Sequence, residues 1–588
     1  MTLSVQVRTS VLAILVIAAA ATGLRSASLG ARPMDDHEAQ VALHAAEGTP
    51  EGSPFWTGSL EAEAEPGYAA LTSLVFQAVG AREASARAIP ALAGILLALS
   101  PLLLREELGQ GKAILASLFL AVSPITVAAS REASGATMAC LGLALVFMAF
   151  VRSRPGGADR WAVWGAVGLG LTLASGRAGW MGIAGIVMGF TIAWFWARRS
   201  DPAFLDSARS LLSRAWVAPV VAIVLVSGAG LTLRFLPDFF SALGTWMQGW
   251  IVFGGMDAAP ALAALALYEP TLLVLGAAGI VAAVSARERT FLALAGWGIG
   301  SLVTVTAYSS RRPEDLVFIL IPFSFLAAHS VHRLAERIQP GENAPVLAGM
   351  LGVLTVLAGF SAVQFSAYGH GQGPAFAALT PGTSLGLALG AIVLMVVVLF
   401  LFGAGWDYAL ARDAGILAVL GIAAALSLSA LWRLNMDPRG SRAGELVRPQ
   451  ASTPSLQLFQ RTVETFSQAS TGRTDAMPID LRGQPPPALA WALRRFPRAL
   501  PIGASNTEQP LVVVAPEGQA PALGADYLGQ VFAVTERWNW QGVLPADPVI
   551  WMVQRQAPLW TENWLLLLRA DLASLGEVPA TSDEAPAP

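Results

Sequence analysis

The segment GTSLGLALGAIVLMVVVLFLFGA, residues 382–404, decides the fold class of this chain. It holds no charged side chain, and almost every residue in it is apolar or glycine. A helix that crosses the hydrocarbon core of a bilayer needs about 20 mostly apolar residues. Residues 382–404 reach that length, so the segment predicts a membrane-spanning helix.

Similar apolar runs recur along most of the chain. Hydrophobic residues make up 54% of the 588 residues and charged residues 13%, whereas a soluble domain carries about 25% charged residues. The mean hydropathy is +0.57. We therefore predict a polytopic α-helical membrane protein with about 13 transmembrane helices. The spans are expected at residues 9–25, 86–104, 112–129, 133–151, 161–175, 178–196, 214–233, 261–284, 290–308, 315–333, 345–364, 382–404 and 412–432.

Two places in this series admit a second interpretation. Only a short polar turn separates residues 161–175 from residues 178–196, so these two spans are the least distinct. Residues 9–25 are also compatible with a cleaved signal peptide, because Arg8 precedes a short apolar core and SASLGA follows it. We favour a retained helix, and in both cases the next loop lies outside.

The loops between the expected spans differ in their content of arginine and lysine, which marks the cytoplasmic side. Loops on the same side as the N-terminus, such as 198–214 and 333–337, hold most of these residues. We therefore place the N-terminus in the cytoplasm, residues 26–85 in a large outer loop, and the chain after residue 432 outside. Within that loop the apolar stretch 67–80 is short for a span, so we expect a helix at the membrane interface.

After a transmembrane domain at 1–432, residues 433–588 predict a small extracytoplasmic α/β domain. A helix is expected after Thr453 as N-cap with Pro454 at its first position, and a second helix in PPPALAWALRRF (485–496). Strands are expected in PLVVVA (510–515), QVFAVTERW (530–538) and VIWMVQR (549–555). No phosphate-binding loop or catalytic-triad spacing occurs there, so we expect a domain that packs on the membrane part or caps it.

The first outer loop contains RPMDDHEAQ, residues 32–40, in which His37 stands among Asp35, Asp36 and Glu38. A carboxylate can act as a general base toward a hydroxyl group. Acidic residues just outside a helix are also commonly part of a solvated loop. The same residues therefore have a catalytic and a structural interpretation.

Arginines are expected at the same outer rim, because the turns that carry them converge if the spans form a bundle. The planar guanidinium group matches a pair of phosphate oxygens and stabilises charge that develops on a phosphate leaving group. With the carboxylates, this favours sugar transfer from a polyprenyl-phosphate donor whose lipid lies in the bilayer. The candidate phosphate-binding residues are Arg131, Arg177, Arg311 and Arg312, with His37 and Glu132 elsewhere on the rim.

These arginines have structural interpretations too. Arg177 can anchor a helix end at the lipid headgroups, and Arg311 and Arg312 can pair with Glu314 or Asp315. A net charge of −3 gives no polybasic signal for nucleic acid.

Metal binding has little support in the sequence. His37 beside two acids could hint at a divalent metal, but His44 and His370 are not evidently near, so no cofactor is predicted. The single cysteine, Cys140, excludes a disulfide framework and a Cys-rich metal site.

Several stretches resemble one family of enzymes. They are EAQVALHA (38–45), G-x-x-x-x-x-A-R-x-x-P-A-L-x-G (80–94), L-R-x-x-L-G (104–109), S-P with S-R (123–131), and LAWALRRF (489–496). The chain resembles the GT-C glycosyltransferases of family 39, the dolichyl-phosphate-mannose–protein mannosyltransferase-like group with its aminoarabinose transferase relatives. More narrowly it resembles the flippase-activity-associated branch. The resemblance covers most of residues 25–150, and the later spans by topology.

The resemblance implies a GT-C fold and inverting hexosyl transfer from a polyprenyl-phosphate donor to a protein, lipid or glycan acceptor. In the family, the acid of an Asp-Glu-type pair in the first outer loop is the catalytic base. Glu38 matches the second member, but His37 stands where relatives carry the aspartate. Either the loop is shifted by one residue, so that Asp36 is the base with Glu38 as its partner, or the base is absent. Asp35 is expected to matter less.

Three classes of function make different demands on these residues. An enzyme needs a carboxylate facing an outer cavity, whereas a non-catalytic GT-C-like component, such as a scaffold in a membrane complex or a partner in lipid-linked sugar flipping, needs only a surface for a partner protein. A transporter places ionisable residues in mid-membrane. The expected span interiors hold almost none, which argues against ion-coupled transport.

Overall fold

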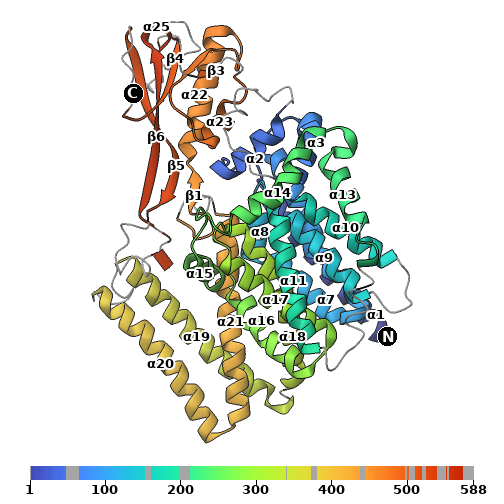
Figure 1. The fold of residues 1–588 in the computed structure, drawn as a ribbon. Helices are drawn as coiled ribbons and strands as arrows, with labels where there is room; N and C mark the ends of the chain where they lie inside the picture. Colours follow the sequence, from blue (N-terminus) through green and yellow to red (C-terminus); the bar gives the residue numbers. More distant parts are fainter. Residues whose placement is uncertain are drawn as a thin grey trace.

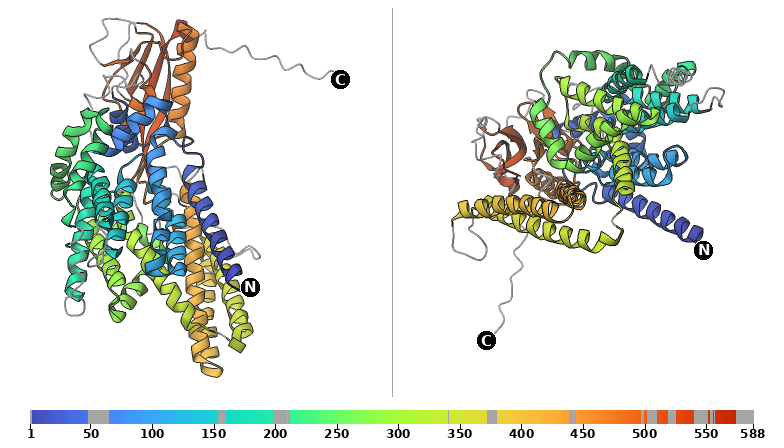
Figure 2. Two further views of the ribbon diagram at one scale, coloured as in Figure 1. Left: turned by 90° about the vertical axis from the view of Figure 1, so that its right-hand side faces the viewer. Right: turned by 90° about the horizontal axis from the view of Figure 1, so that it is seen from below.

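A computed structural model describes most of the chain (Figure 1). The described residues are 2–47, 65–152, 160–197, 209, 212–339, 341–371, 380–437, 444–496, 499–501, 510–518, 525–539, 551–552, 555 and 557–573. A helical body is followed by a C-terminal domain of helices and strands, which lies at one end of that body (Figures 1 and 2). This is the predicted architecture.

The helical body is built in chain order from one helix after another. The first part contains α1 (Thr2–Ser26), α2 (Asp36–Ala46), α3 (Pro66–Val79), α4 (Glu83–Ala86), α5 (Ala88–Leu99), α6 (Arg105–Leu108), α7 (Gln110–Val122), α8 (Pro124–Ser130), α9 (Ala136–Arg152), α10 (Arg160–Ala174) and α11 (Arg177–Ala197). The second part contains α13 (Val217–Val226), α14 (Leu236–Gln248), α15 (Ala258–Tyr268), α16 (Pro270–Ala286), α17 (Arg289–Ala307), α18 (Val317–Arg337), α19 (Ala344–Gly369), α20 (Pro381–Gly405) and α21 (Tyr408–Asn435).

Within the described residues, 7 helices are long and apolar enough to cross a membrane, or up to 9 if two bent pairs each count as one span. The expected thirteen spans all fall on helices, but some of these helices are shorter than a bilayer requires. The polytopic α-helical fold is thus confirmed, while the number thirteen stays a prediction. Helix α20, which covers residues 382–404, has a hydropathy of 3.0 and is only 11% buried inside the protein, as a lipid-facing helix would be.

Prolines break two of the expected spans. Helices α7 and α8 meet at 63° before Pro124, and α15 and α16 meet at 96° before Pro270. Proline has no N–H for the helical ladder, and it disfavours helical geometry in the residue before it. At these two breaks the side chain of Glu269 accepts hydrogen bonds from Ser123 Oγ (2.6 Å) and Ile125 N (3.0 Å). The N–H group of Ile125 at one break, which lacks a helical partner, therefore donates to a side chain from the other break.

Glycines set two further boundaries. Gly176, with a φ of +65°, separates α10 from α11, so the two closely spaced spans are distinct helices as predicted. The span expected at 214–233 is wrong in extent, because α13 ends at Val226. Gly228, Ala229 and Gly230 all have positive φ there, which a continuing right-handed helix does not allow.

Helices α11 and α17 pack closely through glycines. A Cβ on Gly189 would meet the backbone of Gly296 and Trp297, and a Cβ on Gly300 would meet the backbone of Gly185. Small residues let helices approach in a membrane. The consequence for function is positional, because α11 begins at Arg177 while α17 leads directly into the turn that carries Arg311 and Arg312.

The C-terminal domain holds a six-stranded sheet of order β1-β5-β6-β4-β2-β3. Its strands are β1 (Gln450–Ser452), β2 (Ile479–Leu481), β3 (Ala499–Pro501), β4 (Val512–Pro516), β5 (Tyr527–Trp538) and β6 (Leu559–Arg569). Strand β2 pairs in parallel with β3 and β4, and the remaining pairs are antiparallel. Helices α22 (Pro454–Thr471), α23 (Pro487–Leu493) and α25 (Ala570–Ala573) complete it.

Most of the expected elements of this domain are present. The helix after Thr453 begins at Pro454 as predicted, although the Thr453 hydroxyl donates to Ala533 O and does not cap the helix. Strand β4 covers residues 512–515 of the expected PLVVVA, and β5 covers all of QVFAVTERW. The strand expected at 549–555 is wrong where it is described, since Trp551 and Met552 are helical; residues 549–550 and 553–554 lie outside the described residues. Strand β6 was not predicted.

The C-terminal domain packs on the first outer loop rather than standing apart from it. Figure 1 shows α23 beside α2, and Val41, Tyr68 and Trp491 belong to one continuous hydrophobic cluster. Ser452 Oγ donates to Met34 O (2.5 Å), and Arg494 Nη2 donates to Ala81 O (2.6 Å). The loop expected at 26–85 is thus largely an ordered layer between two domains where it is described. Helix α3, expected at the membrane interface, has most of its residues buried in protein.

Candidate active site

A cavity of about 540 Å³ opens where the first outer loop, the helical body and the C-terminal domain meet. Its walls come from the start of α2, the turn after α8, the segment before α15, the turn before α18 and the chain that leads into β1. Seven of the nine candidate residues line it: Asp35, Asp36, His37, Glu38, Glu132, Arg311 and Arg312. The convergence expected from the sequence is therefore seen for most of the set.

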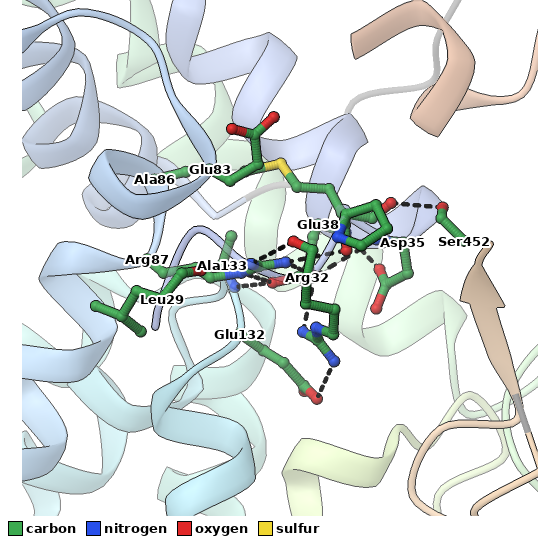
Figure 3. A network of polar contacts seen from close by, with 12 residues as sticks. Leu29, Arg32, Asp35, Glu38, Glu83, Ala86, Arg87, Glu132, Ala133 and Ser452 are labelled. Atoms are coloured by element: carbon green, nitrogen blue, oxygen red, sulfur yellow. Dashed lines mark hydrogen bonds and ion pairs between the residues drawn. The ribbon is translucent and has the colours of Figure 1, made fainter. Parts of the chain in front are cut away.

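Glu38 is the centre of a buried network of ion pairs and hydrogen bonds (Figure 3). Arg87 Nε and Nη2 each donate to its carboxylate at 2.7 Å, and Arg32 Nη2 donates at 2.9 Å. The backbone N–H of Ala133 donates a further hydrogen bond at 2.9 Å. Burial alone would raise the pKa of Glu38, but these cations and donors outweigh it and lower the pKa. Glu38 is 1% exposed, so its carboxylate holds loops together.

Asp35 caps the first turn of α2. Its carboxylate accepts from Glu38 N at 2.8 Å, and the Glu38 side chain accepts in return from Asp35 N, which makes a capping box. Burial and the neighbouring Glu38 raise the pKa of Asp35 to about 7. Since Asp35 lines the cavity, its carboxylate can take up or release a proton there near neutral pH.

Asp36 is turned toward the C-terminal domain. Its carboxylate accepts hydrogen bonds from Gln450 Nε2 and from Ala488 N (3.1 Å), and it lies 3.7 Å from Arg537 Nη2. Burial raises its pKa, and Ala488 and Arg537 oppose that rise. Asp35 and Asp36 both line the cavity, but Asp36 also joins α2 to the C-terminal domain, whereas the pKa of Asp35 is near neutral. Which of the two is the base stays a prediction. The support expected from Glu38 for Asp36 is also absent, since the described partners of Glu38 are other groups.

His37 occupies the position that the family resemblance gives to an aspartate. Arg312 Nη1 donates to His37 Nε2 at 2.8 Å, and Glu314 Oε1 lies 3.8 Å from the same nitrogen. Burial, Arg312 and Arg177 lower the pKa of His37. The imidazole is therefore neutral at physiological pH and accepts the hydrogen bond from Arg312.

Arg312 lies at the centre of the charged wall of the cavity. Its Nη1 is 3.7 Å from Glu314 Oε1 and 4.0 Å from Glu65 Oε1. Glu65 accepts from Gly135 N (2.9 Å) and is 2% exposed, and burial with the nearby Glu314 raises its pKa to about 8. A protonated Glu65 does not compensate the charge of Arg312, so that compensation falls to other neighbours such as Glu314.

Arg177 and Arg311 serve the frame of the site. Arg177 makes a bidentate pair with Asp315 (3.1 and 3.2 Å), and Asp315 also accepts from Arg312 N (2.8 Å). Arg311 donates to the carbonyl oxygens of Val305, Thr306 and Met256. Both side chains hold the turn that presents Arg312. Their expected role in binding the donor phosphate stays a prediction.

Arg131 lies outside this cavity, which corrects the expectation that it shares one cavity with Arg311 and Arg312. It lines a neighbouring cavity of about 230 Å³ and donates to Leu24 O at 2.8 Å. Glu132 stands between the two, 3.3 Å from Arg448 and 3.8 Å from Arg32. Arg131 follows α8 at the expected turn. Because α8 is bent by 63° from α7, Arg131 lies at the wall of the neighbouring cavity.

Three residues of the site were not singled out from the sequence. Arg87 stands within the quoted 80–94 motif, where its charge among apolar residues was a usable signal. Glu65 borders the short apolar stretch that became α3. Arg448 had no local signal, since only the path of the chain between α21 and β1 brings it beside Glu132.

No group of three His, Cys, Asp or Glu side chains with metal-binding geometry occurs among the residues that the structure describes. The ring nitrogens of His44 contact other groups, namely Asp238 Oδ2 (2.7 Å) and Glu47 Oε1 (3.0 Å). Burial opposes a charge on the ring, but these two carboxylates outweigh it and raise the pKa of His44 to about 9. His44 therefore ties α2 to α14 as a cation.

Solved structures with a similar fold exist. The structure of ArnT from Cupriavidus metallidurans bound to undecaprenyl phosphate matches with a TM-score of 0.54 and 16% sequence identity, covering 95% of this chain and 98% of that chain. The same protein in the apo state matches with a TM-score of 0.53 and 17% identity, covering 97% and 99%. The apo oligosaccharyltransferase of Archaeoglobus fulgidus matches with a TM-score of 0.44 and 15% identity, covering 84% of this chain and 64% of that chain.

The match to ArnT runs nearly end to end in both chains, so this chain shares the overall fold of ArnT. No protein-family model and no curated protein matches the chain. Membership of family 39 or of its flippase-associated branch stays a prediction.

Proposed function

We propose that this protein is a membrane glycosyltransferase that transfers a sugar from a polyprenyl-phosphate donor to a protein, lipid or glycan acceptor at the outer face. The observation that carries the proposal is the cavity of about 540 Å³, in which Asp35 with a pKa of about 7 and Arg312 stand on a GT-C-like fold. ArnT, which shares that fold, was solved with undecaprenyl phosphate. A lipid phosphate is therefore a ligand that this architecture can accept.

The proposed reaction is a single inverting displacement. An acceptor hydroxyl oxygen attacks the anomeric carbon of a hexosyl donor, the bond from that carbon to the phosphate oxygen breaks, and polyprenyl phosphate leaves. Asp35 takes the hydroxyl proton, because a base with a pKa near the working pH is the most effective. Arg312 donates to the leaving phosphate, where negative charge grows.

His37 and Glu65 position Arg312 in this scheme. Neutral His37 accepts from Arg312, which orients the guanidinium without cancelling its charge. Glu65, with its pKa raised to about 8, is largely protonated at neutral pH. Both groups thus leave positive charge at the place assigned to the phosphate.

A second candidate function is that of a non-catalytic GT-C-like component, such as a scaffold in a membrane complex or a partner in lipid-linked sugar flipping. Two observations support it. His37 stands where the resemblance puts the catalytic aspartate, and Asp36 and Glu38 are engaged in structural contacts. A non-catalytic component needs no donor phosphate in the cavity, and replacing Asp35 then has no effect on function.

Replacing Arg312 by Gln should lower transfer by about 10²–10³-fold, the loss typical of one group that stabilises developing charge. Purified protein would be assayed with labelled polyprenyl-phosphate hexoses and an acceptor-containing membrane extract. Arg312→Lys should recover little, because lysine lacks the planar fork.

Arg333→Gln is the matched control for Arg312. Arg333 lies on α18, the helix that follows Arg312, and its side chain is 41% exposed near Glu288. Transfer by this variant should equal that of the wild type. If Arg312→Gln retains full transfer, the donor phosphate does not bind at this wall.

The proposed orientation puts the N-terminus in the cytoplasm and the C-terminal domain outside the cell membrane. In intact cells, a membrane-impermeant maleimide should label an engineered cysteine at Ser470 and leave one at Ser207 unlabelled. The native Cys140 is buried, so background labelling should be low. The reverse pattern would invert the assignment.

A further inference from the structure

Four of the eleven residues that line the second cavity, of about 230 Å³, are arginines. It lies between the chain that follows α1, the turn after α8 and the end of α21. Its lining includes Arg32, Arg87, Arg131 and Arg448, and one acidic residue, Asp437. A cavity with this composition attracts anions.

The carboxylates near the four arginines are already shared. Glu38 pairs with Arg87 and Arg32, and Glu132 lies near Arg448 and Arg32. For Arg131 no carboxylate partner is found in the part of the chain that the structure describes; its described hydrogen bond goes to Leu24 O.

Two observations agree with a missing ligand, one with its negative charge and the other with a hydrogen-bond donor on it. Burial together with Arg448, Arg32 and Arg87 lowers the pKa of Arg131 to about 10, so the side-chain charges behind this shift are all positive. Asn435, which lines the cavity at 8% exposure, has a buried Oδ1 without a hydrogen-bond donor among the described residues. A ligand hydroxyl can satisfy that atom.

The depth of the cavity selects among anions. Helix α21 is apolar enough to span a membrane, and the predicted first span is part of α1. The cavity lies where both helices end, on the side of the C-terminal domain. If both helices span the bilayer, this place is at the level of the lipid headgroups.

We propose that this second cavity binds a phosphate group, contacted by Arg131 and Arg448, separately from the donor phosphate at Arg312. The ligand chemistry is a phosphomonoester, which a lipid headgroup or free phosphate can supply. Arg448 lines both cavities, so a phosphate held here lies next to the first cavity. The inference does not depend on catalysis at Asp35.

The test counts bound farnesyl phosphate, a short prenyl phosphate, on the full-length protein by native mass spectrometry. The wild type should bind two equivalents. Arg131→Gln should weaken one of them by about tenfold or more, as loss of a charge-assisted contact predicts. Arg312→Gln should weaken only the other. Arg412→Gln, at the opposite end of α21 beside Asp413, should bind as the wild type does.

The two sources of phosphate are separated by competition. Displacement of the Arg131-dependent equivalent by millimolar inorganic phosphate indicates a site for free phosphate, and resistance indicates a lipid headgroup. Farnesol, which lacks the phosphate, should not occupy the site. Unliganded thermal unfolding of Arg131→Gln verifies its fold; if it does not fold, Arg131→Lys replaces it and should bind more weakly than the wild type.

The outcomes separate the two proposals. One equivalent that is lost in Arg131→Gln and kept in Arg312→Gln supports the second site and removes the donor site. One equivalent with the opposite dependence overturns the second site. Binding that is the same in Arg131→Gln and the wild type, or equal binding of farnesol, also overturns it.

Discussion

Replacing Asp35 by Asn is expected to reduce glycosyl transfer by about 10²–10⁴-fold, the typical contribution of a general base. The amide of Asn is not a base near neutral pH, so it cannot take the proton of the acceptor hydroxyl. It is also a good N-cap, so its amide oxygen can still accept from Glu38 N, as Asp35 does at 2.8 Å. The loss should therefore appear in kcat/KM for transfer, with unchanged thermal unfolding and unchanged binding of a prenyl phosphate.

Asp36→Asn is the matched control for Asp35. The carboxylate of Asp36 accepts from Ala488 N and Gln450 Nε2, and Asn can satisfy only one of two donors. This change should weaken the contact of the C-terminal domain by about 1–3 kcal/mol while transfer persists. If Asp36→Asn abolishes transfer and Asp35→Asn does not, the ranking predicted from the sequence is restored. Full transfer in both variants would show that neither carboxylate is the base, and an absence of transfer by the wild type would favour the non-catalytic component.

The pH dependence follows from the same carboxyl group. With a pKa of about 7 for Asp35, kcat/KM should rise with pH through that value as the base loses its proton. The effect on stability has the opposite sign. In the unfolded chain an aspartate has a pKa of about 3.9, so the folded state binds more protons between the two values. The contribution of Asp35 to stability is therefore full below about pH 4 and is lost as pH rises to about 7.

Replacing Glu38 by Ala is expected to destabilise the fold by about 3–5 kcal/mol, the cost of removing one partner of a buried ion pair. Arg87, at 1% exposure, would keep hydrogen bonds to Leu29 O and Arg32 O but lose its anion. The Ala133 N–H would also lose its acceptor. Fluorescence-detected size-exclusion chromatography after a heat step should show a large fall in the folded fraction.

Arg473→Ala provides the control for Glu38. Arg473 pairs with Asp475, but its side chain is 72% exposed, and exposed pairs contribute about 0–1 kcal/mol. A Glu38→Ala protein as stable as Arg473→Ala would show that the network in Figure 3 does not stabilise the fold. A stable but inactive Glu38→Ala protein would return Glu38 to the catalytic candidates.

Much of the fold follows from local physical rules, and the sequence reveals it. In a bilayer the backbone N–H and C=O groups of a long uncharged run such as 382–404 need partners within the run, which a helix provides. Helix α20 covers that run. Thr453 and Pro454 predicted the start of α22 for equally local reasons. The lengths of spans were less accessible, because Pro124 and the glycines at 228 and 230 break helices where hydropathy continues.

The candidate site divides along the same line. By itself the sequence indicated the region, since Asp35, His37 and Arg312 are charged or polar residues at the ends of apolar runs, and all three line one cavity. Their contacts and their burial were decided only by the tertiary structure. Whether a carboxylate can act as a base or instead joins two parts of the protein depends on partners distant in sequence, such as Arg87 for Glu38 and Ala488 for Asp36. Burial and charges from those partners set the pKa of each group, and no local pattern in residues 32–40 contains them.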